Sequence, residues 1–206
     1  MIFDMNDAIY REKELAIFDG IIDLIKKGSN VYSITVSEIA KSANVGKGTI
    51  YDYFDTKEET ISKAILYNID NEIEDAKDRI ALKDDFKGRY YEMLDIVAEN
   101  LKNKFCTINM LLSVGGFHEF YEYLVNQRHD ISQYIYKIEQ EIDKLLEIGF
   151  EEGVIGIGGN IYYQRMAIKG SISAFISYIN MEEYWQGIDI DTAMDLSYKL
   201  AIKALN

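Results

Sequence analysis

The sequence predicts an all-α fold in which a small helix-turn-helix unit precedes a larger helical domain. The 206 residues include no proline, the main helix breaker, and 48% of them are hydrophobic. Apolar residues recur at the three- and four-residue spacing of helices, and there is no strand-like alternation of useful length. Residues 35–59 also contain two Thr-x-x-Glu capping boxes, each of which marks a helix start. Together these observations predict two short helices joined by a tight turn.

A supporting helix is expected first, over residues 7–27. Its apolar positions recur every three, four or six residues and therefore share one face: Ile9, Leu15, Phe18, Ile22 and Ile25. Gly28-Ser29-Asn30 then ends this helix.

The two short helices follow. Thr35 is expected to cap a helix over residues 36–43, and the inward residues of this helix are Ile39, Ala40 and Ala43. Asn44 tolerates the left-handed backbone of a helix end, and Val45 fills the corner between the two helices.

The second of these helices is expected over residues 47–54, with Ile50 and Phe54 turned inward. Its outward residues are Lys47, Thr49, Asp52 and Tyr53. Thr56 and Glu59 then form the second capping box, which opens a helix that runs to about residue 82.

The remaining chain reads as successive helices, with breaks near residues 104–107, 126–129, 152–160 and 186–191. The helix expected over residues 161–181 has an apolar face and a face of small residues: Ala167, Gly170, Ser171, Ala174 and Ser177. Asp191 is expected to cap the final helix. Because both helices have more apolar surface than one chain can bury, they are predicted to pair with their copies in a homodimer.

Composition excludes several classes of protein. The formal charge of −13 argues against broad coating of nucleic acid but not against a local contact. Cys106 is the only cysteine, so it cannot form an intramolecular disulfide. The N-terminus has acids where a signal peptide needs basic residues, and the longest uncharged stretch, residues 170–181, is too short to span a membrane. We therefore expect a cytoplasmic protein.

The run ITVSEIAKSANVGKGTIYDYFDTKEETISKAI resembles the TetR family of bacterial transcriptional regulators, through its G-T-I-Y-x-Y-F block and the Lys-Glu-Glu that opens the next helix. The resemblance implies a DNA-binding domain over residues 8–66 and a helical effector-binding and dimerisation domain over residues 67–206. It also implies a repressor that reads a pseudo-palindromic operator with two recognition helices about 34–36 Å apart.

Seven residues would form the DNA interface if the resemblance holds: Thr35, Lys47, Gly48, Thr49, Tyr51, Tyr53 and Lys57. Thr35 and Lys57 would contact phosphate, and residues 47–49 would approach base edges. Tyr51 would pack its ring on the small domain and point its hydroxyl at the DNA backbone, whereas Tyr53 would reach a base or sugar.

Two residues depart from the family pattern. Gly46 stands where a side chain usually caps the recognition helix, so this helix should begin with a weaker cap. Asp52 is acidic where the family has polar or basic residues, and it would repel phosphate unless it accepts a hydrogen bond from a cytosine amino group.

The resemblance also implies a small-molecule effector pocket among the helices between residues 84 and 181. The expected lining residues are His118, Tyr121, Tyr134, Tyr162 and Met166. The acidic surroundings favour a cationic or neutral amphipathic effector, which would shift the helix of residues 56–82 and so change the spacing of the two DNA-binding heads.

Two other classes of function stay open. One is a helical ligand-binding dimer that has lost DNA binding, which the acidic total and Asp52 favour. The other is an enzyme, but no clustered nucleophile, base or metal set is visible. His118 and His129 lie eleven residues apart without a further ligand at helical spacing, so we expect no metal and no cofactor.

Overall fold

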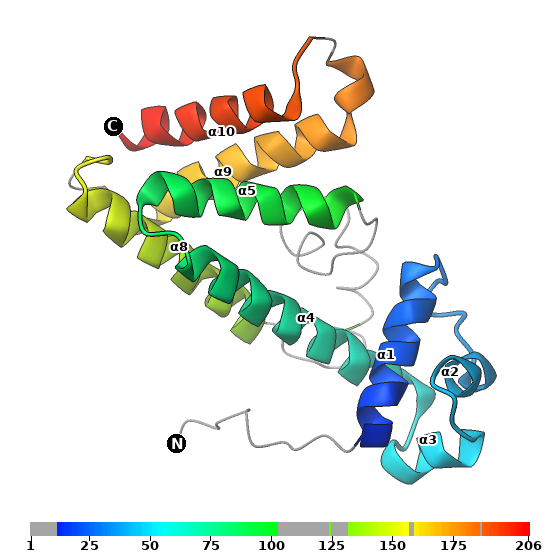
Figure 1. The fold of residues 1–206 in the computed structure, drawn as a ribbon. Coiled ribbons are helices and arrows are strands. Elements are labelled where there is room, and N and C mark those ends of the chain that lie inside the picture. The colour runs from blue at the N-terminus through cyan, green and yellow to red at the C-terminus, as the bar shows by residue number, and fades with distance from the viewer. Residues whose placement is uncertain (1–11, 103–123, 125–131, 157–158, 186) are drawn as a thin grey trace, which may run out of the picture. The chain divides into compact units, whose positions relative to one another are not determined.

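A computed structural model describes residues 12–102, 124, 132–156, 159–185 and 187–206, and these residues form helices and connecting turns without a β-strand (Figure 1). The α-helices are α1 (Glu12–Lys26), α2 (Val36–Ser42), α3 (Lys47–Tyr53), α4 (Lys57–Ala81), α5 (Phe86–Lys102), α8 (Ser132–Glu151), α9 (Ile161–Asn180) and α10 (Ile190–Leu205). The predicted all-α fold is confirmed. None of the described helices is long and apolar enough to cross a bilayer.

Contacts along the chain divide it into two compact units. Of the described residues, the first unit contains 12–68 with Leu124, and the second contains 69–102 and everything from 132 onward. Helix α4 contributes its first turns to the first unit and the rest of its length to the second. The domain boundary between residues 66 and 67 stays a prediction, because contact units do not establish independent folding.

Helix α1 provides the apolar centre of the first unit. Phe18, Ile22 and Ile25 are buried on it as the helical period predicts, and Ile17 and Ile21 are buried as well. The Phe18 ring packs against two other rings. Its centroid is 5.7 Å from that of Phe54, which follows α3, and 5.4 Å from that of Tyr67 in α4. The apolar stripe of α1 is therefore wider than the sequence pattern indicated.

Helices α1 and α2 pack closely at Gly20. A Cβ atom built on Gly20 would lie 2.8 Å from the backbone nitrogen of Ala43 and 3.1 Å from its Cβ. Real Cβ atoms essentially never come that close to another atom, so this contact requires glycine.

The second unit buries one large apolar cluster between α4, α5, α8, α9 and α10. At its centre the Tyr90 hydroxyl lies 2.7 Å from both the Ser171 and the Ser197 hydroxyl oxygens. Each serine donates in turn to a carbonyl, Ser171 to that of Ile168 and Ser197 to that of Ser171. This buried polar group joins α5, α9 and α10, which lie side by side in Figure 1.

Two details differ from the sequence-based prediction. Helix α10 begins at Ile190, and its cap is Asp189, whose carboxylate accepts the Thr192 N–H at 2.8 Å; Asp191 lies in the first turn. Ser171 is buried toward Tyr90 and does not share the exposed small-residue face of Gly170, Ala174 and Ser177. The expected breaks near residues 104–107 and 126–129 lie outside the described residues.

Candidate nucleic-acid interface

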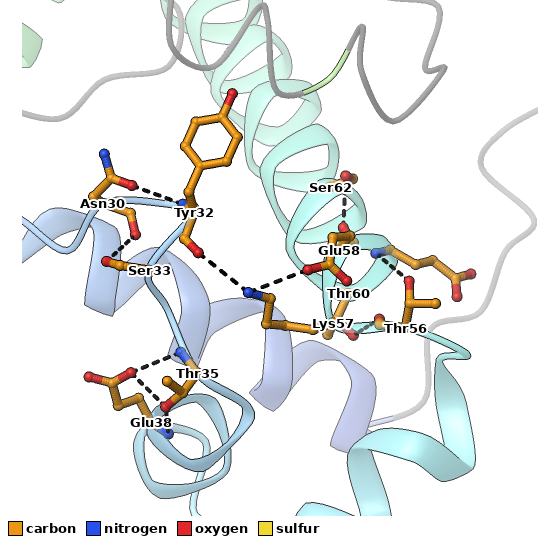
Figure 2. Close-up of polar contacts among 11 residues, drawn as sticks. Asn30, Tyr32, Ser33, Thr35, Glu38, Thr56, Lys57, Glu58, Thr60 and Ser62 are labelled. Atoms are coloured by element: carbon orange, nitrogen blue, oxygen red, sulfur yellow. Dashed lines mark hydrogen bonds and ion pairs between the residues drawn. The ribbon is translucent and has the colours of Figure 1, made fainter.

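Helix α2 begins with the predicted capping box (Figure 2). The Glu38 N–H donates to the Thr35 hydroxyl at 3.3 Å, and the Glu38 carboxylate accepts the Thr35 N–H at 2.8 Å and its hydroxyl at 2.7 Å. These hydrogen bonds from Thr35 hold the pKa of Glu38 below its ordinary value. In this structure the Thr35 hydroxyl therefore donates to Glu38, and a phosphate contact would require it to exchange that partner.

The turn between α2 and α3 is set by backbone bonds. The Ala43 N–H donates to the Ile39 carbonyl at 2.9 Å, and the Val45 N–H donates to the Ala40 carbonyl at 2.9 Å. Asn44 has a φ of 51°, the left-handed conformation that the sequence predicts for this helix end. Two short helices are thereby held at a fixed turn.

Helix α3 begins at Lys47, and its N-cap residue, Gly46, provides no side-chain cap, as predicted. Ile50 and Phe54 are buried and anchor the helix to the core of the first unit. The other side of the helix is open: Lys47, Gly48, Tyr51 and Asp52 are exposed, and Thr49 and Tyr53 are half-buried. A Cβ atom built on Gly48 would have nothing within 4 Å.

Tyr51 is 56% exposed, and the packing of its ring on the small domain stays a prediction. The side chain extends from the same open face as Gly48 and Asp52.

Lys57 is already engaged within the protein (Figure 2). Its ammonium group donates to the Tyr32 carbonyl at 3.4 Å and lies 3.3 Å from the Glu58 carboxylate. The start of α4 is thereby joined to the turn that precedes α2. Sequence reasoning missed this contact, because the two residues are twenty-five positions apart.

The second capping box differs in one bond from the prediction. The Thr56 hydroxyl accepts the Glu59 N–H at 3.0 Å, but the Glu59 carboxylate accepts the N–H of Asp55, at 2.9 Å, in place of that of Thr56. The carboxylate also lies 2.7 Å from the Lys63 ammonium group, which is the main reason that the pKa of Glu59 is lowered.

The second unit contains an apolar cavity of about 80 Å³ between α4, α5, α8 and α9. It is lined by Ile73, Ala76, Lys77, Ile80, Met93, Ile96, Val97, Ile138, Glu141, Ile142 and Ile172. None of the five predicted effector-binding residues is among them. Tyr134 is buried elsewhere, Tyr162 and Met166 are 73% and 50% exposed on α9, and His118 and Tyr121 lie outside the described residues.

Two of the predicted lining residues lie on α9 away from this cavity, and their role in effector binding stays a prediction. The helix turns Ile168, Ile172, Phe175 and Ile176 toward the core, which puts Tyr162 and Met166 on the opposite, solvent-facing side. No group of three His, Cys, Asp or Glu side chains in the described parts of the chain is placed to hold a metal ion.

Ionic contacts hold α4 on both sides of this cavity. Lys137 of α8 pairs with Asp70 of α4 and lies 3.3 Å from Glu74. Toward α5, Arg79 lies 2.8 Å from Glu92 and 2.6 Å from Glu99. These carboxylates raise the pKa of Arg79, with Glu99 contributing most.

A short helix with an open face, set against a second helix by a tight turn, is a helix-turn-helix DNA-binding unit. Residues 30–64 match the model of the family described as bacterial regulatory proteins of the tetR family. Residues 30–64 are therefore a DNA-binding domain of the kind found in TetR-family regulators, and the described fold around it is all-helical.

Solved structures resemble the whole described fold. The fatty acid degradation regulator FadR from Bacillus halodurans is 20% identical with a TM-score of 0.66, and the alignment covers 96% of each chain. FadR from Bacillus subtilis, solved in complex with stearoyl-CoA, is 21% identical with a TM-score of 0.60 over 93% of this chain and 97% of that one. A TetR regulator from Haloarcula marismortui reaches a TM-score of 0.68 at 15% identity, covering 96% of this chain and all of its own. No curated protein matches the sequence.

Proposed function

We propose that this protein is a ligand-responsive repressor, released from a pseudo-palindromic operator by a small-molecule effector. The observation that carries the proposal is the open outer face of α3. Lys47 and Gly48 are exposed on this face, and the buried side chains of Ile50 and Phe54 anchor the opposite side of the helix. An exposed helix face rigidly backed by a core is what insertion into the major groove requires.

The proposed DNA contacts are those inferred from the sequence: Thr35, Lys47, Gly48, Thr49, Tyr51, Tyr53 and Lys57. Lys47 and Gly48 are exposed on α3 and would approach base edges. The Lys57 ammonium group has three N–H donors, so it could contact phosphate while its bond to the Tyr32 carbonyl positions the turn before α2.

Binding to DNA tests the proposal directly. We expect the purified protein to bind one DNA segment flanking its coding region, measured by fluorescence anisotropy, with an affinity that falls steeply as salt rises. Lys47→Ala should weaken binding about tenfold or more. It should also reduce the slope of the logarithm of the binding constant against the logarithm of the salt concentration by about one.

Lys87→Ala, which removes the same charge from α5 in the second unit, is the matched control and should leave binding unchanged. Absence of salt-sensitive binding to every flanking segment would favour the alternative function, a helical ligand-binding dimer that no longer binds DNA.

We propose that two copies associate through α9 and α10. Met166, Gly170, Ala174 and Ser177 form an exposed stripe on α9, and Leu196 and Leu200 are about half exposed on α10. Small residues allow helices to approach closely. A two-fold axis would pack the α9 stripe of one protomer against the same stripe of its partner. Two linked DNA-binding units would then match a pseudo-palindrome.

Leu200→Glu is expected to convert the dimer to a monomer, because the carboxylate would lose its water at the interface. Sedimentation velocity of the variant beside the wild type measures this change. Gln140→Glu, which adds the same single charge at an exposed position of α8, is the control and should leave the dimer intact. A dimer that survives Leu200→Glu would place the interface elsewhere.

We further propose that the effector carries a long apolar chain. The cavity lining is apolar apart from Lys77 and Glu141, which favours a hydrocarbon chain over a cation. The acidic composition had suggested a cationic or a neutral amphipathic effector. The complex of the Bacillus subtilis FadR with stearoyl-CoA supports this class of ligand.

The size of the cavity suggests how binding would act on α4. Ligand pockets usually measure about 300–1,000 Å³, whereas this cavity measures about 80 Å³. A long chain could enter only if α4 moved away from α5 and α8, against the ion pairs of Lys137 and Arg79. Since α4 begins in the DNA-binding unit, this movement would displace α3, and DNA would weaken effector binding by the same factor.

Ala76→Trp is expected to fill the cavity and abolish release of the protein from DNA by stearoyl-CoA, while DNA affinity itself is retained. Ala81→Trp, exposed at the end of α4, is the matched control and should respond like the wild type. Titration of the protein–DNA complex with stearoyl-CoA, monitored by anisotropy, measures both. If the Ala76→Trp protein is released from DNA at the same stearoyl-CoA concentration as the wild type, this cavity is excluded as the effector site.

A further inference from the structure

Asp52 has no structural role in the described part of the molecule. It is the one acid of α3, its side chain is exposed, and no described residue forms a hydrogen bond or ion pair with it. Three of the five acids between residues 30 and 63 do have partners: Glu38 with Thr35, Glu58 with Lys57, and Glu59 with Lys63. Asp55 resembles Asp52 in lacking a side-chain partner, but it follows the helix.

The position of Asp52 makes its carboxylate accessible to a molecule docked on α3. Gly48 lies one helical turn earlier and carries no side chain to shield it, and the space above Gly48 is empty. Tyr51, the preceding residue, also projects outward. A groove that receives the outer face of α3 would therefore receive the Asp52 carboxylate as well.

An ionised carboxylate in a DNA groove needs a hydrogen-bond donor. Carboxylate oxygens only accept, so a phosphate or a base acceptor opposite Asp52 would be repulsive, and its lost hydration would be uncompensated. In the major groove only cytosine N4 and adenine N6 donate. Adenine carries the N7 acceptor beside its amino group, which repels the second carboxylate oxygen, whereas cytosine has no acceptor on that edge.

We propose that Asp52 determines operator specificity by accepting a hydrogen bond from the N4 amino group of one cytosine in each half-site. The inference rests on the proposed DNA-binding function, which it extends to the base sequence that is read. Asp52 lowers affinity for DNA in general, through charge repulsion, and restores it only where cytosine is present.

The test begins with selection of binding sites from a library of random duplexes by the full-length wild-type protein. Anisotropy then compares the selected site with sites changed at single base pairs, using the wild type, Asp52→Ala, Asp52→Asn and the control Asp55→Asn. We expect the wild type to prefer cytosine about tenfold at one position per half-site. Asp52→Ala should lose this preference while it keeps all others, and Asp52→Asn should shift it toward adenine, which asparagine contacts through N6 and N7.

The outcomes separate this inference from the function on which it rests. If the wild type selects a motif and Asp52→Ala discriminates among bases at every position as the wild type does, the inference is wrong and the DNA-binding function stands. Complete loss of binding by Asp52→Ala would also overturn it, because removal of one specificity contact removes one preference and not the affinity. If the wild type selects no motif, the DNA-binding function fails and the inference fails with it. Asp55→Asn should give the wild-type pattern, and a changed preference there would assign the effect to net charge.

Discussion

Gly20→Ala is expected to destabilise the first unit by about 1–3 kcal/mol, the usual cost of overpacking a tight contact. The new methyl group would lie 2.8 Å from the Ala43 nitrogen, and this neighbour is backbone, which cannot move aside as a flexible side chain could. Helices α1 and α2 would have to separate. Because Ala43 ends α2 just before the turn, the same shift would misplace α3 and weaken DNA binding.

Thermal unfolding of the full-length protein measures the first effect, with the melting temperature expected to fall by about 5 °C or more. DNA binding at a temperature where the variant remains folded measures the second. Gly20→Ser should behave like Gly20→Ala or worse, since its Cβ occupies the same position. A variant with wild-type stability would show that α1 can move away from α2 at little cost.

Gly48→Ala is expected to have opposite effects on stability and on DNA binding. Replacing an exposed helical glycine by alanine stabilises the folded state by about 0.5–1 kcal/mol, and the new methyl group would meet nothing within 4 Å. The same methyl group would stand on the open face of α3, between the helix backbone and the base edges. We therefore expect operator affinity to fall about tenfold or more while the melting temperature rises.

Asn71→Ala is the control. Asn71 is exposed on α4, so its replacement by alanine also raises helix propensity but does so away from α3. It should raise stability without changing DNA affinity, so that any loss in Gly48→Ala can be assigned to the α3 surface. Equal DNA affinity for Gly48→Ala and the wild type would contradict close approach of the α3 backbone to base edges.

The helix-turn-helix unit could be predicted largely from the sequence, because its determinants are local. The capping box of Thr35 and Glu38, the left-handed Asn44 and the inward pair Ile50 and Phe54 all act within about four residues. Such contacts form wherever the spacing is right. The same reasoning gave the wrong partner in two places. The Glu59 carboxylate accepts the N–H of Asp55 instead of Thr56, and the cap of α10 is Asp189 instead of Asp191. In both places several neighbouring groups compete for one carboxylate or one helix end.

The position of the apolar cavity could not be predicted in the same way. The aromatic and methionine residues of the second unit suggested Tyr162 and Met166. The cavity is lined instead by isoleucine, valine, alanine and methionine side chains from four helices, together with Lys77 and Glu141. Which face of α9 is buried depends on how α5, α8 and α10 pack around it. An aromatic residue carries no information on that choice, because exposed and buried positions both accept it.

By itself the sequence determined the helical class, the DNA-binding unit and the outer face of α3, since each depends on hydrogen bonds and side-chain spacing within a turn or two of helix. Only the tertiary structure decided why residue 20 is glycine, that Lys57 bonds to the Tyr32 carbonyl, that Tyr90 joins two serines, and where the apolar cavity lies. Each of these features involves atoms from segments far apart in the chain. Their proximity is a property of the packed helices, which local periodicity does not encode.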